Sequence, residues 1–150
     1  MITIEQIGSF TIPNKPVARA ALIKGMDRAV KRAIKQARLN ASGRPGPNVD
    51  KGMLRASITG EVRDSGADIV GVVGAGNNLK YAAIQELGGT IKPKDPNGYL
   101  TFKIDGHFVS VKSVTLPARP YLKPAVDSPF MRGVIDHELR AAINGVTGAT

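Results

Sequence analysis

Apolar side chains recur along this chain with two periods, one typical of helices and the other of strands. Between residues 17 and 39 they return every three or four positions, which predicts a long helix packed along one side. Pro16 suits the first turn of this helix. A second series predicts a helix from about Ser128 to Ile143, in which Ser128 caps the first turn and Pro129 occupies it.

Strands are predicted where apolar and polar residues alternate. Residues 56–63 alternate and predict a half-buried strand, in which Gly60 marks a bulge. Residues 69–74 predict a second strand after a turn, so the two strands are expected to form an antiparallel hairpin. A second hairpin is predicted around the turn pair Asp105-Gly106, which favours a type I′ turn. A short helix, Tyr81–Leu87, ends at two glycines.

These elements together predict the fold class and the domain organisation. We expect an α+β fold, in which a long N-terminal basic helix packs on a small antiparallel sheet with hairpins, a short helix and a C-terminal helix. Residues 1–16 are expected to form an N-terminal arm or strand, residues 17–145 a single domain, and residues 146–150 a flexible tail.

The segment Leu116–Val126 combines rigidity with apolar character. Pro117, Pro120 and Pro124 restrict its backbone, and the residue before each is pushed toward extended geometry. A flexible linker would not need the apolar residues that continue through it. The segment is therefore predicted to be a rigid arm that docks on a surface, either its own or that of a neighbour.

The positive charge is concentrated in the first helix. The net charge is +9, and residues 1–44 hold nine basic and two acidic residues, which gives +7. Between Arg19 and Arg38, seven Lys and Arg residues face only Asp27, so few pairs four residues apart can form. This pattern leaves two interpretations open. The basic residues form either a solvated face or a surface for an anionic partner, which would be DNA phosphate or an acidic protein surface. The candidate contacts are Arg28, Lys31, Arg32, Lys35 and Arg38.

The sequence contains few residues in patterns typical of an enzyme or of a cofactor-binding protein. The chain has no cysteine, and His107 and His137 lack the spacing of metal ligands. Gly74-Ala75-Gly76 resembles the start of a dinucleotide loop, but Leu79 occupies the place of its third glycine. No serine lies in a nucleophile motif, and no apolar run is long enough to span a membrane. We therefore expect no catalytic residues, no metal, no cofactor, no membrane partner and no enzymatic activity.

Three segments resemble motifs of a known family. Asp50–Ile58 resembles Asp-x-Gly-x-Leu-Arg-x-Ser-Ile, and Tyr81–Gly88 resembles Tyr-Ala-x-x-x-Glu-Phe-Gly, with Leu87 in the aromatic position. Leu116–Ala125 resembles x-Pro-Ala-Arg-Pro-Phe-Leu-x-Pro-Ala. Together they are similar to the neck or tail-completion (head–tail joining) proteins of long-tailed phages, including the Mu-like virion morphogenesis proteins. The resemblance covers about residues 17–145.

This resemblance implies a structural virion protein that assembles as a ring, typically a hexamer, at the head–tail junction. The implied partners are other copies of the chain, the head connector or adaptor ring, the tail terminator or tail tube proteins, and packaged DNA in the channel. The implied location is the virion, with assembly in the host cytoplasm. A tail-tube terminator ring and a basic nucleic-acid-binding domain remain alternatives.

The arm and the second motif supply the candidate interface residues. They are Tyr81, Glu86, Leu116, Pro117, Arg119, Pro120, Tyr121 and Leu122. Arg119 stands between Ala118 and Pro120, a fixed position from which a guanidinium could bind a neighbour's carboxylate. If the arm contacts a neighbour, Arg119→Ala combined with Tyr121→Ala should leave the fold intact and prevent virion completion.

Overall fold

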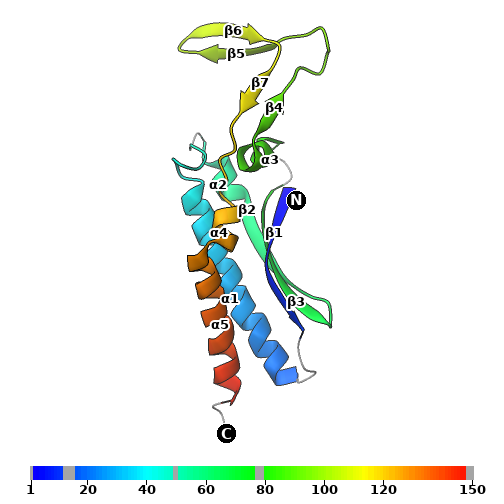
Figure 1. Ribbon diagram of the computed structural model, residues 1–150, viewed down its shortest axis with the longest axis vertical. Coiled ribbons are helices and arrows are strands. Elements are labelled where there is room, and N and C mark those ends of the chain that lie inside the picture. The colour runs from blue at the N-terminus through cyan, green and yellow to red at the C-terminus, as the bar shows by residue number, and fades with distance from the viewer. Residues whose placement is uncertain (1, 12–15, 49–50, 77–79, 148–150) are drawn as a thin grey trace.

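The computed structural model describes residues 2–11, 16–48, 51–76 and 80–147 (Figure 1). The chain forms a body and a finger, which we define as residues 89–116. The body contains the elements β1 (Ile2–Thr11), α1 (Pro16–Asn40), α2 (Met53–Ser57), β2 (Ile58–Asp64), β3 (Asp68–Ala75), α3 (Lys80–Leu87), α4 (Lys123–Asp127) and α5 (Pro129–Thr147). The finger contains the strands β4 (Gly89–Ile91), β5 (Leu100–Ile104), β6 (His107–Val111) and β7 (Val114–Leu116).

The sheet of the body has three antiparallel strands in the order β1-β3-β2, and α1 packs on one of its faces. Two glycines allow this helix to approach the strands closely. A Cβ atom on Gly60 would lie 2.8 Å from Cγ1 of Val30, and one on Gly71 would lie 2.7 Å from Sδ of Met26. These distances are too short for real side chains, so the helix could not keep its position over larger residues.

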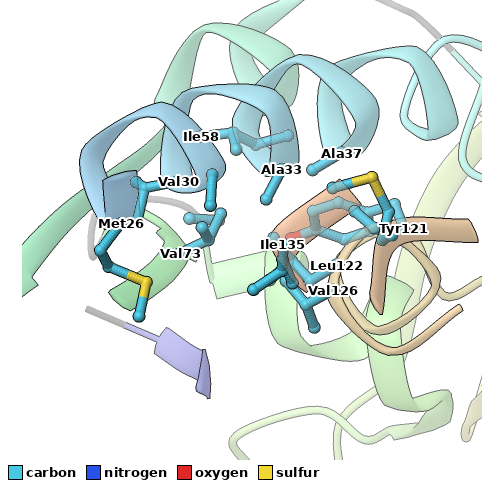
Figure 2. Close-up of a cluster of buried hydrophobic side chains, with 14 of the residues drawn as sticks. Met26, Val30, Ala33, Ala37, Ile58, Val73, Tyr121, Leu122, Val126 and Ile135 are labelled. Atoms are coloured by element: carbon cyan, nitrogen blue, oxygen red, sulfur yellow. The ribbon is translucent and has the colours of Figure 1, made fainter. Parts of the chain in front are cut away.

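The core lies between α1, the sheet and the C-terminal helices. Figure 2 shows Ala33 and Ala37 of α1 facing Tyr121 and Ile135, which come from the last part of the chain. Small residues on α1 leave room for these larger side chains. Farther along the same helix pair, a Cβ on Gly25 would lie 2.9 Å from Cβ of Ala142, so α1 and α5 also pack closely.

The finger projects from the body next to α3 (Figure 1). Strands β4 and β7 pair antiparallel and form its stalk. Strands β5 and β6 pair antiparallel and form a ribbon at its end. Asp105 and Gly106 connect the two strands of the ribbon with φ values of 48° and 88°, the positive values that a type I′ turn requires.

The predicted α+β fold is confirmed, with the long N-terminal helix, both hairpins, the short helix and the C-terminal helix in the expected places. The unbroken register between β2 and β3 shows that the predicted bulge at Gly60 is wrong, because Gly60 pairs regularly with Val73. Residues 2–11 form a strand that pairs with β3, and α5 continues to Thr147. The predictions for residues 1, 12–15 and 148–150 fall outside the described residues.

Candidate functional site

The carboxylate of Glu86 holds the proline-rich segment against α3. Glu86 lies in α3 and is only 4% exposed. Its Oε2 accepts hydrogen bonds from the backbone N–H groups of Tyr121 (2.8 Å) and Leu122 (2.9 Å), and its Oε1 accepts one from Lys123 (2.9 Å). These groups lie where α4 begins, at the unpaired, partly positive end of a helix. We call Glu86 and these three N–H groups the latch.

Two further contacts join α3 to the segment that precedes α4. The backbone N–H of Arg119 donates to the carbonyl of Gln85 at 2.7 Å. Gly88 ends α3 with a φ of 70°, and a Cβ atom there would lie 2.7 Å from the backbone nitrogen of Ala118. A glycine is therefore required at position 88 for both its conformation and the close approach of the segment.

Tyr121 fills the space beside the latch. Its side chain is 1% exposed, and its hydroxyl lies 3.5 Å from the carbonyl of Ala82. Burial raises the pKa of the Tyr121 phenol, and the nearby charge of Glu86 raises it further. The side-chain amide of Asn40 donates to the carbonyl of Tyr121 at 3.1 Å, so the end of α1 is tied to the same point.

The first motif segment lies at the same junction, in its described part from Lys51 to Ile58. The backbone N–H of Gly76 donates to the carbonyl of Ser57 at 3.1 Å, which fixes the end of α2 beside the sheet. A hollow of about 430 Å³ separates α2 from α3 and is lined by residues of both, among them Met53, Arg55, Tyr81 and Gln85. All three motif segments thus meet where the finger joins the body.

The structure corrects part of the predicted interface. Tyr121 and Leu122 lie in the core, and the carboxylate of Glu86 accepts the hydrogen bonds of the latch. These three residues therefore contact their own chain. The arm docks on its own surface, the first of the two predicted options. We therefore expect Arg119→Ala with Tyr121→Ala to destabilise the fold, because Tyr121 is a core residue.

The other predicted interface residues remain accessible. Tyr81 is 42% exposed, Pro117 and Pro120 are exposed, and Leu116 is half-buried in β7. Arg119 is also half-buried, and its Nε is enclosed without a hydrogen-bond acceptor among the residues that the structure describes.

Several charges of the basic helix are paired with residues of other elements, which the local sequence pattern did not predict. Glu138 of α5 accepts hydrogen bonds from Nε of Arg28 (2.7 Å) and Nε of Arg32 (2.8 Å). Arg19 pairs with Asp64 at the end of β2, and Lys31 pairs with Asp27 at 2.6 Å. Arg28 and Arg32 therefore help to join α1 to α5, and they are not wholly free for an outside partner.

The remaining predicted contacts of α1 lie closer to its C-terminal end. Lys35 is exposed, and no described residue pairs with its ammonium group. Nη2 of Arg38 donates to the backbone carbonyl of Ile58 at 2.9 Å, which fixes the guanidinium beside α2. Of the five predicted basic contacts, Arg28 and Arg32 thus join α1 to α5. The other three, Lys31, Lys35 and Arg38, are exposed.

We expect part of the free energy of unfolding to be lost in acid, when Glu138 becomes protonated. The hydrogen bond from Arg28 is the main cause that lowers the pKa of Glu138 below its usual 4.5, with Arg32 contributing and burial opposing. A carboxyl group with a lowered pKa stabilises the fold above its unfolded pKa, and that contribution is lost as pH falls through its folded pKa. Below pH 4.5, Glu138→Gln should therefore lose less stability than the unchanged protein.

Urea unfolding at a series of pH values checks this prediction. The difference between the unfolding midpoints of the two proteins should be largest at neutral pH and should shrink in acid. Asp136→Asn is a suitable control because Asp136 pairs with Arg140 on the exposed surface of the same helix. A constant difference across the pH range would contradict the assigned role of Glu138.

The described residues offer no obvious centre for metal or membrane chemistry. Within residues 2–11, 16–48, 51–76 and 80–147, no three His, Asp or Glu side chains gather in a way that could hold a metal ion. Over the same ranges, each helix is too short or too polar to cross a bilayer. Comparisons of the chain with protein-family models, with curated proteins and with solved structures found no match.

Proposed function

We propose that this chain is a structural virion protein of a long-tailed phage. It forms a ring, typically a hexamer, at the head–tail junction, where it completes the tail or neck and joins the tail to the head connector. Its neighbours are further copies of itself, the connector or adaptor ring, and the tail terminator or tail tube proteins. The three motif segments support this proposal because they form one junction that sets the base of the finger.

The observation that carries the proposal is the apolar face of the β5–β6 ribbon. Leu100 pairs with Val111 and Phe102 pairs with Val109, so these four side chains share one face of the ribbon. Ile104 belongs to the same face by alternation. Phe102 is 36% exposed and Ile104 is 49% exposed. An apolar face of this kind is typical of a protein–protein contact.

The opposite face of the ribbon has a different character. The hydroxyls of Thr101 and Ser110 are hydrogen-bonded at 2.9 Å, and the ammonium of Lys103 lies 5.8 Å from the ring centre of Phe108. A two-stranded hairpin is only marginally stable by itself. We infer that the apolar face packs on a neighbouring copy. The opposite face, which is polar apart from the exposed ring of Phe108, remains in water.

A ring requires that one surface of each subunit meets a different surface of the next. The finger suits this geometry because it stands clear of the body, and the latch fixes its base. Arg119 lies beside that base with an enclosed Nε that has no acceptor among the described residues. Because the Nε is enclosed, a carboxylate from a neighbouring subunit would have to pair with the other nitrogens of this guanidinium.

Mass photometry of the purified protein, alone and mixed with tailless heads or with free tails, tests the proposal. We expect a ring in solution, or subunits that join rings on one of these particles. Binding to free tails alone would assign the chain to the tail terminator position, and binding that joins heads to tails would assign it to the neck.

A ribbon variant links this assembly to the apolar face. Phe102→Ser with Ile104→Ser should abolish association and leave the urea midpoint unchanged, because neither residue belongs to the core. Thr101→Ala with Ser110→Ala changes the polar face and should still assemble. A monomer that ignores both particles and binds DNA, with a log–log salt slope of about −0.9 per phosphate, would instead support a nucleic-acid-binding domain.

A further inference from the structure

A groove with a basic rim lies between the C-terminal half of α1 and the short helix α2. It has a volume of about 480 Å³ and is lined by Lys31, Ile34, Lys35, Arg38, Leu39 and Arg55. We call these six residues the basic groove. Four of them are cationic and none is acidic, so the groove carries a concentrated positive charge.

Most of this charge is not neutralised within the chain. Lys31 has Asp27 as a partner, but Lys35 and Arg55 are exposed and pair with no acidic side chain that the structure describes. Arg38 donates one hydrogen bond to a backbone carbonyl and keeps its charge. That bond holds the guanidinium in place, so less side-chain freedom is lost when it binds an anion.

The groove is also apolar between its cations. Leu39 is 58% exposed, and Ile34 beside it is half-buried. Lys35 and Leu39 also line a second hollow of about 280 Å³, which continues onto α5 at Phe130 and Val134. Phe130 is 72% exposed. The concave surface therefore offers two exposed apolar side chains along a path rimmed by positive charge.

This combination discriminates between the two kinds of anionic partner. Phosphates of DNA would use the cations, but a duplex backbone would gain little from Leu39 and Phe130. A protein segment that carries both carboxylates and apolar side chains would use both parts of the surface, by ion pairing at the rim and by burial between the cations. Charge complementarity and the exposed apolar side chains point to the same occupant.

We propose that the basic groove and its extension to Phe130 bind an acidic, partly apolar segment of a partner protein. If the proposed function is correct, that segment belongs to an adjoining ring of the virion. The chemistry of the groove does not depend on this, and binding can be measured without virion particles.

The test uses the full chain and two fluorescein-labelled peptides of equal length and equal glutamate content. One peptide carries leucines spaced as on one face of a helix, and the other carries serines at those positions. Fluorescence anisotropy should show about tenfold tighter binding of the leucine peptide, since it buries apolar side chains. Leu39→Ser with Phe130→Ser should remove this preference.

Charge variants then locate the binding surface. Lys35→Gln with Arg55→Gln should weaken binding of the leucine peptide by about tenfold. Lys92→Gln with Lys94→Gln is the matched control, because it removes the same charge from exposed positions on the finger. This control should change affinity by less than about twofold.

Three results would overturn the proposal. Equal affinity for the two peptides would mean that the apolar side chains are not used. An equal loss in the Lys92 and Lys94 control would indicate general attraction to a basic protein. Labelled duplex DNA that binds more tightly than the leucine peptide, and loses affinity in the Lys35 and Arg55 variant, would assign the groove to nucleic acid. Urea unfolding of each variant checks that the chain is folded, so that a loss of binding can be assigned to the changed side chains.

Discussion

Glu86→Ala should lower the free energy of unfolding by about 4 kcal/mol, because it leaves three backbone N–H groups without their acceptor, at about 1–3 kcal/mol each. Small domains have a total stability of about 5–15 kcal/mol, so this variant should be close to unfolding. The loss also removes the negative charge from the start of α4. Urea unfolding followed by circular dichroism measures the effect.

Two further variants separate the latch from a general effect of charge. Glu61→Ala removes a carboxylate of the exposed pair with Arg63 and should leave the midpoint nearly unchanged. The urea midpoint of Glu86→Gln should fall between those of the two alanine variants. Its amide keeps one acceptor oxygen, but the NH2 group that replaces the other oxygen is a donor and cannot accept from the backbone N–H groups. A Glu86→Ala protein as stable as the Glu61→Ala protein would show that the latch contributes little.

Tyr121→Ala should cost about 3–5 kcal/mol, the range found when a buried aromatic residue is reduced to alanine. The side chain is 1% exposed and packs between α1 and the C-terminal helices, so its removal leaves a cavity in the core. Differential scanning calorimetry should show a lower melting temperature, and the urea midpoint should fall with it.

Tyrosines elsewhere in the chain provide the matched comparison. Tyr81→Ala makes the same chemical change at a position that is 42% exposed and should cost much less. Tyr121→Phe keeps the ring and removes only a hydroxyl whose contact with Ala82 is long, at 3.5 Å, so it should be mild. If Tyr121→Ala instead unfolds like the unchanged protein but fails to assemble, Tyr121 faces a neighbour, as the sequence predicted.

The sequence predicts those parts of the fold that local patterns determine. The period of α1 appears within the helix itself, and the ribbon turn depends on two adjacent residues, Asp105 and Gly106, with positive φ. Ser128 caps α5 as expected, because its hydroxyl accepts a hydrogen bond from the backbone N–H of Met131, three residues later, at 3.3 Å. Each of these features needs only neighbouring residues.

The features that sequence reasoning missed depend on residues far apart in the chain. Glu86 binds N–H groups 35 to 37 residues later, and Arg28 reaches Glu138 across 110 residues. No local pattern contains such pairs. Helix α4 had a local signal, since Pro124 is suited to a first helical turn, but the prolines around it favoured an extended arm instead. Strands β4 and β7 are too short to show alternation.

The position of the finger within the chain separates the residues that stabilise the fold from those of the proposed subunit contact. Its two ends lie side by side, because Gly89 pairs with Leu116, and it is inserted between α3 and α4. Of the buried hydrophobic residues in the described part of the chain, none comes from residues 89–116. Insertions or deletions in the finger can therefore change its length and shape while the core of the body stays the same.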